Sequence, residues 1–326
     1  MKETLNWGLL STAKINRALI TPLNASKRTC LLAVASRDIS SAEAFAREWK
    51  IPRAHGSYEA LLADPEIDVV YNSLPNHLHA EWTIKALRAG KHVFCEKPFA
   101  LTLAEADEMI SASKETGNVL AEAFMYRHHA QTLKVKEIVD SGTLGKLQLI
   151  KGAFTFTLNR EGNFRFVKEM GGGSIWDVGC YPISYARTIV GEEPVEVFGW
   201  QVEGPGGSDE SFIGQMRFAN GVHAQFDSGF KSPLRSYLEI VGSAAVLKIP
   251  NPFKPGIKNE LVLAHGGSEE KIKVTGTELY RGEVEDMCDA IVLKKPSCIS
   301  LQDSRGNVAA ILALLESANR KTPVFL

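Results

Sequence analysis

The sequence predicts an α/β protein: a doubly wound parallel sheet, followed by an α+β domain on a large, mainly antiparallel open sheet. Three observations support this prediction. The chain has 326 residues, which exceeds the size at which one core usually suffices. Strand and helix patterns alternate up to residue 124, and long strand patterns dominate afterwards. We therefore expect two domains, residues 1–124 and residues 125–326.

The first 124 residues alternate between apolar strand patterns and amphipathic helix patterns. Residues 31–35 are entirely apolar, as expected for a strand that is buried on both faces of a parallel sheet. Repeated β–α units indicate a doubly wound sheet, whose ligand crevice lies at the carboxyl ends of the strands. Strands are expected at 5–10, 31–35, 67–71, 92–95 and 119–124, and helices at 14–20, 40–49, 58–63, 79–89 and 103–116.

The pattern changes after residue 125. Asn220-Gly221 separates two strand patterns and is the strongest short-range hairpin signal in the chain. Because long strands are here joined by turns rather than by helices, we expect a largely antiparallel sheet. Strands are expected at 146–156, 195–202, 212–218 and 222–226, and helices at 132–140, 283–293 and 303–320.

The composition excludes several classes of protein. Hydrophobic residues make up 44% and charged residues 23% of the chain, and the net charge is −1. This balance gives no reason to expect a nucleic-acid or membrane partner, and no apolar run approaches the length of a membrane span. The first residues show no signal peptide. The five cysteines are scattered and lack CxxC spacing, which indicates reduced thiols in a cytoplasmic protein, without disulfides and without a metal site.

The turn after the first expected strand lacks the glycines of a dinucleotide fingerprint. Ser11, Ala13 and Asn16 occupy the three positions of the GxGxxG pattern. Small residues still let backbone N–H groups approach a phosphate, and hydroxyl groups can donate to it. An ordinary turn between a strand and a helix explains these residues equally well. The candidate cofactor contacts here are Ser11, Thr12, Ala13, Lys14 and Ile15.

The end of the second strand favours NADP over NAD. NAD enzymes usually place Asp or Glu there to bind the ribose 2′-hydroxyl, whereas arginine accommodates the 2′-phosphate of NADP. This chain has Ser36-Arg37 at that place, and its acid, Asp38, comes only later. We therefore expect NADP as the cofactor and NAD as the second choice. The alternative is that Arg37 is an ordinary solvated loop residue.

The segment Leu74-Pro75-Asn76-His77-Leu78-His79 follows the third long strand. Pro75 stiffens a turn at the carboxyl end of the sheet, where a nicotinamide ribose would lie. His79 opens the next helix and is expected to be a helix cap or a cofactor contact rather than a base. Leu74, Asn76 and His79 are therefore candidate cofactor-binding residues.

Two further motifs carry the candidate chemistry. Lys97, in Glu96-Lys97-Pro98, ends an apolar strand, and Asp177 and Tyr181 follow a glycine run. A free tyrosine, with a pKa of about 10, is a poor base at neutral pH, but a nearby lysine cation lowers that pKa. Four residues apart on a helix, Asp177 and Tyr181 would share one face.

Each of these residues also has a structural interpretation. Ser174-x-x-Asp177 before an apolar run is the pattern of a capping pair at a helix start. Tyr181 alone would be an interface residue of a helix, and Lys97 alone a solvated strand end. Pro182 is expected to remove one helical hydrogen bond and to bend the helix that carries the tyrosine.

With these motifs the chain resembles the glucose–fructose oxidoreductase / inositol dehydrogenase / MocA (Gfo/Idh/MocA) family. The resemblance is greatest to the branch with dihydrodiol dehydrogenase and NADP-dependent D-xylose dehydrogenases, because Tyr181 stands where most members have histidine. The missing glycines depart from the pattern. The motifs that carry the resemblance are Leu74-Pro75-Asn76-x-x-His79, Glu96-Lys97-Pro98 and Gly171-Gly172-Gly173-x-x-x-Asp177-x-Gly179-x-Tyr181.

The resemblance implies an amino-terminal Rossmann domain, a carboxy-terminal domain for substrate binding and oligomerisation, and a homodimer or homotetramer. It implies catalytic roles for Lys97, Asp177 and Tyr181, with Tyr181 as the acid–base. Glu96 and Lys97 would also contact the cofactor, and Arg165 would reach the nicotinamide side of the site. The alternative for Arg165 is a surface arginine.

The expected function is hydride transfer between NADP and a sugar or small cyclic polyol, as in an aldose dehydrogenase or a dihydrodiol dehydrogenase. One alternative is a keto-sugar reductase of the same family. Another is a nucleotide-binding sensor without turnover, which the missing glycines favour. The presence of Lys97, Asp177 and Tyr181 together argues against a sensor, because a sensor needs no proton-transfer residues.

Overall fold

The computed structural model describes residues 4–326 and divides into two compact units. The first unit runs to Met125 and also includes Tyr280–Arg305, and the second comprises Tyr126–Leu279 and Gly306–Leu326. The expected ranges 1–124 and 125–326 place the first boundary well. They do not describe the return of Tyr280–Arg305 to the first unit.

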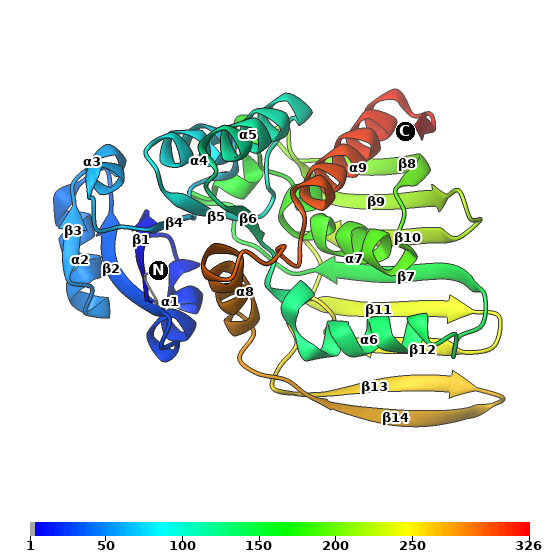
Figure 1. Cartoon of the computed structure of the whole chain (residues 1–326). Helices are drawn as coiled ribbons and strands as arrows, with labels where there is room; N and C mark the ends of the chain where they lie inside the picture. Colours follow the sequence, from blue (N-terminus) through cyan, green and yellow to red (C-terminus); the bar gives the residue numbers. More distant parts are fainter. Residues whose placement is uncertain (1–3) are drawn as a thin grey trace. The chain divides into compact units, whose positions relative to one another are not determined.

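The first unit is built on a six-stranded sheet in the order β3-β2-β1-β4-β5-β6, with all neighbours parallel (Figure 1). This is the strand order of a doubly wound dinucleotide-binding fold, and it confirms the fold prediction for this part of the chain. The strands are β1 (Leu5–Leu10), β2 (Thr29–Ala35), β3 (Arg53–His55), β4 (Val69–Asn72), β5 (His92–Glu96) and β6 (Leu120–Ala123), and the helices are α1 (Asn16–Ala25), α2 (Ile39–Trp49), α3 (Tyr58–Ala63), α4 (His79–Arg88), α5 (Leu103–Thr116) and α8 (Arg281–Val292).

The carboxyl ends of the strands lie side by side. Leu10 pairs with Ala35 of β2 and with Asn72 of β4, and Asn72 pairs with Cys95 of β5. The loops that follow these four strands therefore leave the sheet at one edge. The chain order reverses between β1 and β4, which is where ligands bind to open α/β sheets.

Helix α8 belongs to the first unit because its apolar side completes the core beneath the sheet. Val284 and Met287 of α8 are fully buried in one cluster with Trp7, Tyr71 and Phe94 of β1, β4 and β5. The amphipathic pattern of residues 283–293 predicted the helix. It carries no information about which core the apolar side fills.

The second unit is built on a nine-stranded sheet in the order β14-β13-β12-β11-β7-β10-β9-β8-β15. Only β7 and β10 pair in parallel, so the expectation of a mainly antiparallel sheet is confirmed. The strands are β7 (Leu147–Thr155), β8 (Pro194–Glu203), β9 (Asp209–Phe218), β10 (His223–Gly229), β11 (Arg235–Gly242), β12 (Val246–Pro250), β13 (Lys258–His265), β14 (Ser268–Thr275) and β15 (Val324–Phe325).

The expected hairpin at Asn220-Gly221 joins β9 to β10. Gly221 has a φ of 87°, in the region that favours glycine, and the two strands pair from Arg217 and His223 onward. The turn chemistry therefore acts as predicted, with the register set next to the turn.

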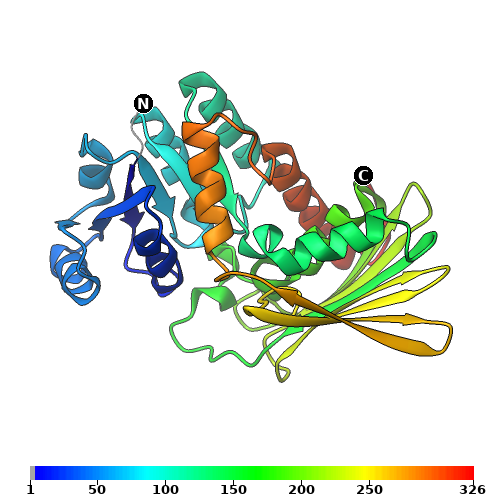
Figure 2. The ribbon, with the colours of Figure 1, turned by 60° about the horizontal axis from the view of Figure 1, so that its bottom comes forward.

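The helices of the second unit lie on one side of its sheet (Figures 1 and 2). They are α6 (Ala130–Asp140), α7 (Cys180–Val190) and the part of α9 (Leu301–Arg320) that follows Gly306. Gly199 of β8 and Gly214 of β9 face Leu314 of α9 so closely that a Cβ atom on Gly199 would lie 2.7 Å from the Leu314 carbonyl oxygen. Successive residues of a strand alternate between faces, so their neighbours point to the opposite, helix-free face.

The helix-free face carries an apolar cluster. Trp200 of β8 pairs with Ile213 of β9, and the two side chains are 52% and 49% exposed. The ring of Phe198 lies 4.3 Å from that of Trp200, between centroids. Separately, no helix in residues 4–326 combines the length and apolarity needed to cross a lipid bilayer.

The packing of α8 generates a stability prediction. We expect Met287→Ala to lower the free energy of unfolding by about 2–5 kcal/mol, because it opens a cavity in the core that α8 shares with β1, β4 and β5. Urea unfolding followed by circular dichroism measures this loss. Leu293→Ala at the end of the same helix is the control, since Leu293 is 54% exposed. Equal effects of the two substitutions would contradict the assignment of α8 to this core.

Candidate active site

The turn after β1 has the geometry of a phosphate-binding turn despite its missing glycines. Ser11 has a φ of 129°, a conformation for which glycine is the usual residue. The Ser11 hydroxyl accepts a hydrogen bond from the Ala13 N–H (3.2 Å), and the Asn16 side-chain amide donates to the Ser11 carbonyl (2.6 Å). These bonds hold a serine in the conformation of the first fingerprint glycine.

Backbone donors are available at this turn. Within residues 4–326 the N–H groups of Thr12, Lys14 and Ile15 donate to no protein acceptor, and α1 begins directly after them. Unpaired N–H groups at a helix start bind anions, so the turn fits a pyrophosphate. That Ser11, Thr12, Ala13, Lys14 and Ile15 contact the cofactor stays a prediction.

Ser36 and Arg37 directly follow β2, as expected, and the exposed Arg37 is hydrogen-bonded to the phenol of Tyr58 on α3. Asp38 is the N-cap of α2, with its carboxylate accepting from the N–H groups of Ser40 and Ser41. The arginine and the acid of this loop therefore have different partners on different elements.

His79 is completely buried at the start of α4. Its Nδ1 lies 2.8 Å from the carbonyl oxygen of Pro98, and its Nε2 lies 2.8 Å from that of Leu74. Burial lowers the pKa of the His79 ring, and the two carbonyls oppose this by favouring the charged form. One imidazole thus joins the loop after β4 to the loop after β5.

This position decides one of the two expected roles of His79. Leu78, not His79, is the N-cap of α4, and it makes no side-chain capping bond. The cap interpretation is therefore wrong, because the imidazole turns into the sheet edge rather than back onto the helix. The cofactor contacts of Leu74, Asn76 and His79 stay predictions.

A second buried contact holds the other side of Lys97. The Tyr71 phenol of β4, which is fully buried, donates a short hydrogen bond to the Glu96 carboxylate of β5. The other Glu96 carboxylate oxygen accepts from the backbone N–H of Lys97 at 3.2 Å. Burial and the neighbouring Glu96 carboxylate hold the pKa of Tyr71 well above its usual range, so the phenol stays a donor. Lys97 therefore sits between two fixed residues, Glu96 and Pro98.

Tyr181 lies in the first turn of α7 and is 3% exposed. Its ring lies among three aromatic rings, with centroid distances of 5.7 Å to Tyr126, 5.4 Å to Phe154 and 5.7 Å to Phe253. Such packing leaves a phenol little rotational freedom, since each ring contact restricts its rotamer. The tyrosine is thus held in one orientation before any substrate binds.

Asp177 lies in a π-helical turn, Ile175–Gly179, that precedes α7. The expected regular helix with Asp177 and Tyr181 on one face is therefore wrong, because an i→i+5 turn changes the angle between residues four apart. The irregularity expected at Pro182 lies one turn earlier, since Pro182 itself is inside α7. The Asp177 carboxylate pairs with the Arg165 guanidinium, Nε to Oδ2 at 2.9 Å.

The capping interpretation of Ser174 and Asp177 is also wrong. The Ser174 hydroxyl makes no capping bond and instead donates to Oδ2 of Asp209, at 2.6 Å. The same oxygen accepts from the Ile175 N–H at 3.0 Å. Asp209, on β9, therefore caps the turn in place of Ser174 and leaves the Asp177 side chain to Arg165.

The glycine run before this turn permits close approach of two main chains. A Cβ atom on Gly172 would lie 2.7 Å from the carbonyl oxygens of Arg165 and Val167, and one on Gly173 would lie 2.2 Å from Asp209 Oδ1. The Gly173 N–H donates to the Arg165 carbonyl at 2.8 Å. The run thereby fixes the segment that carries Arg165, which is no isolated surface arginine. Its cofactor contact stays a prediction.

Asp209 and Glu210 are functional residues that the sequence reasoning missed. Both are buried, and as neighbours on β9 they point to opposite faces. Glu210 pairs with Arg160 and Lys231 through short ion pairs. Two adjacent acids at a strand start are the only sequence signal, and their partners lie far along the chain.

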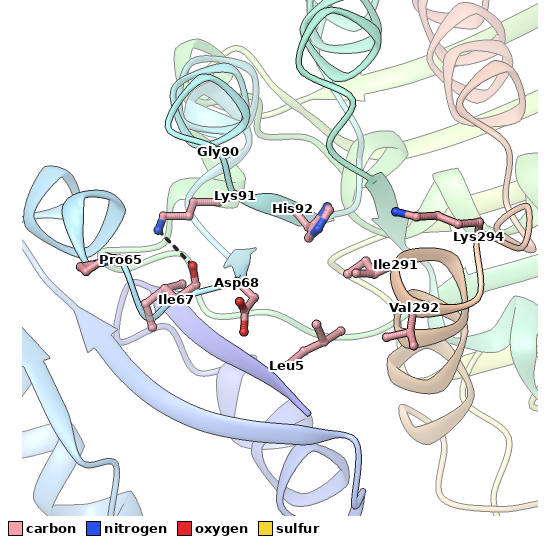
Figure 3. A pocket seen from close by; sticks show the side chains of 10 residues that line it. All are labelled: Leu5, Pro65, Ile67, Asp68, Gly90, Lys91, His92, Ile291, Val292 and Lys294. Carbon is pink, nitrogen blue, oxygen red and sulfur yellow. Dashed lines mark hydrogen bonds between the residues drawn. The ribbon is translucent and has the colours of Figure 1, made fainter. Parts of the chain in front are cut away.

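The first unit has a pocket of about 350 Å³ at the opposite edge of its sheet, where β1, β4 and β5 begin (Figure 3). Its Lys91 ammonium donates to the carbonyl oxygens of Asp64 (2.6 Å) and Ile67 (3.0 Å). Asp68 accepts from the Asn6 N–H at 2.7 Å. These bonds join strand starts, so we do not assign the pocket to the cofactor, whose expected contacts follow strand ends.

Two family models match the chain. One, described as an oxidoreductase family with an NAD-binding Rossmann fold, matches residues 5–124, and the Gfo/Idh/MocA carboxy-terminal domain matches residues 132–248. The chain belongs to the Gfo/Idh/MocA family of oxidoreductases. This confirms the resemblance carried by the motifs around Lys97 and Tyr181.

Several relatives of this Gfo/Idh/MocA protein have known names. The D-xylose 1-dehydrogenase (NADP(+)) 2 of Haloferax volcanii is 34% identical over 98% of this chain and 99% of its own. The trans-1,2-dihydrobenzene-1,2-diol dehydrogenase of Xenopus tropicalis is 28% identical over 94% and 95%. The crystal structure of KijD10, a 3-ketoreductase from Actinomadura kijaniata in complex with NADP and TDP-benzene, has a TM-score of 0.92 and 27% identity, covering 96% of this chain and 98% of that one.

The buried Asp209 generates a pH prediction for this Gfo/Idh/MocA protein. Burial raises its pKa from the ordinary 3.8 to about 6, against the hydrogen bonds from Ser174 and Ile175. Between these two pH values the folded state binds more protons than the unfolded state, so stability falls as pH rises. We expect a loss of about 3 kcal/mol in the free energy of unfolding between pH 4 and pH 7 from this group.

The variant Asp209→Asn isolates this effect. A single amide oxygen can accept from both Ser174 and Ile175, because both bonds now end on one carboxylate oxygen. Urea unfolding at several pH values should show a wild-type stability that declines relative to the variant as pH rises from about 4 to 6. A constant difference between the two proteins over that range would contradict the buried titration.

Proposed function

We propose that this protein transfers a hydride between NADP and a hydroxyl-bearing carbon of a sugar or small cyclic polyol. Its NADP-dependent xylose dehydrogenase and dihydrodiol dehydrogenase relatives support the substrate class and the cofactor. The observation that carries the proposal is the fixation of two proton-handling side chains. Lys97 stands between two anchored residues, and Tyr181 stands in an aromatic cluster.

The residues of the first unit fit a dinucleotide. Bound NADP supplies the hydride acceptor of the oxidation. The N–H groups of Thr12, Lys14 and Ile15 would hold the pyrophosphate, and Ser36 and Arg37 the 2′-phosphate. The remaining proposed cofactor contacts are Ser11, Ala13, Leu74, Asn76, His79, Glu96, Lys97 and Arg165.

Proton transfer is assigned to Tyr181. In the oxidation the substrate hydroxyl loses its proton to the Tyr181 oxygen while its carbon loses the hydride, and the reduction reverses both transfers. The Lys97 ammonium stabilises the phenolate and polarises the reacting oxygen. Asp177, oriented by its ion pair with Arg165, accepts a hydrogen bond from a second substrate hydroxyl and so sets the carbon that reacts.

A keto-sugar reductase is the second candidate, favoured by the likeness to the KijD10 3-ketoreductase. It uses the same residues in the opposite direction. A screen of sugars, polyols and keto-sugars with NADP⁺ or NADPH, followed by the absorbance of the reduced nicotinamide, separates the two. Nucleotide binding without turnover of any compound would instead support a sensor.

Removing the proton-transfer groups tests the mechanism. We expect Tyr181→Phe and Lys97→Met to lower kcat by about 10²- to 10⁴-fold on the substrate found in the screen, as general acid–base groups do. Steady-state kinetics measures this, and NADPH binding to Tyr181→Phe should be unchanged. Tyr237→Phe in β11 is the control. Near-wild-type turnover by Lys97→Met would remove Lys97 from the mechanism.

We also propose a homo-oligomer that pairs through the helix-free face of the second unit, where Phe198, Trp200 and Ile213 are exposed. Isolated side chains this apolar on an open sheet are typical of interfaces. We expect Trp200→Asp to convert the oligomer to monomers in sedimentation velocity at micromolar concentration. An unchanged oligomer would place the interface elsewhere, and a monomeric wild type would contradict the proposal.

A further inference from the structure

Cofactor choice depends on which charge faces the adenosine ribose. An acid after β2 binds the ribose hydroxyls of NAD, and an arginine accommodates the 2′-phosphate of NADP. This chain has both, because Arg37 and Asp38 are adjacent and exposed in the loop between β2 and α2. An ionised Asp38 that pointed at the ribose would repel the 2′-phosphate and accept a hydrogen bond from the 2′-hydroxyl of NAD.

The Asp38 carboxylate is instead committed to α2. One oxygen accepts from the Ser40 hydroxyl (2.8 Å) and N–H (3.3 Å), and the other accepts from the Ser41 hydroxyl (2.7 Å) and N–H (2.9 Å). The two serine hydroxyls are the largest causes that lower the pKa of Asp38 to about 2. The carboxylate is thus charged at every working pH, and its lone pairs point toward the helix.

Arg37 is held from the other side. Its guanidinium donates to the phenol oxygen of Tyr58, the first residue of α3. Tyr58 is 8% exposed, and its ring packs edge-on against Trp82 with centroids 4.9 Å apart. The Ser36 N–H donates to the His55 carbonyl at 3.1 Å, which joins the loop after β2 to the segment that leads into α3. The phenol is therefore a rigid anchor for a flexible arginine.

We propose that Tyr58 and the pair Ser40–Ser41 are positioning residues that make this chain prefer NADP over NAD. Tyr58 orients Arg37 toward the 2′-phosphate, and the two serine hydroxyls turn Asp38 away from it. None of the three needs to touch the cofactor. The inference rests on the proposed function only for the assignment of Arg37 to the 2′-phosphate.

Direct binding tests the Tyr58 part without any substrate. The dissociation constants of NADPH and NADH are measured by nicotinamide fluorescence for the wild type, Tyr58→Phe, Arg37→Met and the double variant. We expect Tyr58→Phe to weaken NADPH by about 3- to 10-fold, the worth of one hydrogen bond, and NADH by less than about 2-fold. In the Arg37→Met background, Tyr58→Phe should have no further effect on NADPH.

The serine part is tested with Ser40→Ala/Ser41→Ala. Release of the carboxylate should weaken NADPH and strengthen NADH, which narrows the ratio of their dissociation constants by about 10-fold. Adding Asp38→Asn should restore NADPH binding, because asparagine still caps a helix but carries no charge. An unchanged ratio in the double serine variant, or no rescue by Asp38→Asn, would overturn this part.

Matched controls separate positioning from stability. In Tyr237 the phenol also accepts from an arginine, Arg235 (3.4 Å), and Ser111 donates to the Glu115 carboxylate on α5 (2.8 Å). Tyr237→Phe and Ser111→Ala should leave both dissociation constants unchanged. Equal weakening of NADPH and NADH in Tyr58→Phe indicates a purely structural role and overturns the inference.

The outcomes distinguish the two levels of the argument. If Arg37→Met leaves the NADPH constant unchanged, the assignment of Arg37 under the proposed function fails, and the Tyr58 inference fails with it. If Arg37→Met weakens NADPH but Tyr58→Phe does not, the assignment stands and only the inference is overturned.

Discussion

The carboxyl edge of the nucleotide-binding sheet depends on the contacts of one buried imidazole. Two carbonyl groups, those of Leu74 and Pro98, are directed at the ring of His79 in a place without access to solvent. Buried carbonyls need donors, and here a single side chain serves two loops that the parallel topology keeps apart in sequence. The position of Lys97 is therefore set by the same residue that sets the loop after β4. Preorganisation of this kind removes the cost of ordering a catalytic group during the reaction.

The second unit meets the same requirement with charge. Asp209 and Glu210 are adjacent acids whose carboxylates leave β9 on opposite sides, one toward the turn before α7 and the other toward Arg160 and Lys231. Burial of a carboxylate is costly unless donors or cations surround it. Each acid therefore recruits a segment of chain, and together they hold the loop with Arg165 and the turn with Asp177. The substrate-side residues are thus arranged by groups that lie beneath them.

Much of the fold could be predicted from the sequence, because the alternation of apolar strands and amphipathic helices directly reflects a buried parallel sheet. The return of α8 could not, since an apolar helix face does not identify its core. The site divides in the same way. Lys97 and Tyr181 follow from local motifs, whereas Ser11 in a glycine conformation is rare enough that no pattern predicts it. The capping interpretation of Ser174 failed because a distant acid, Asp209, competes more effectively than a neighbour three residues away.

The π-helical turn at Ile175–Gly179 has a consequence for how such a site changes over evolutionary time. A π turn is equivalent to one residue added to an α-helix, so its deletion rotates the preceding chain by about 100° relative to α7. Asp177 and Tyr181 lie on either side of this joint. The direction of the substrate-binding carboxylate can therefore be reset by a change in length while the phenol keeps its aromatic packing. Insertions and deletions at this turn, more than substitutions, are the events that redirect one group without moving the other.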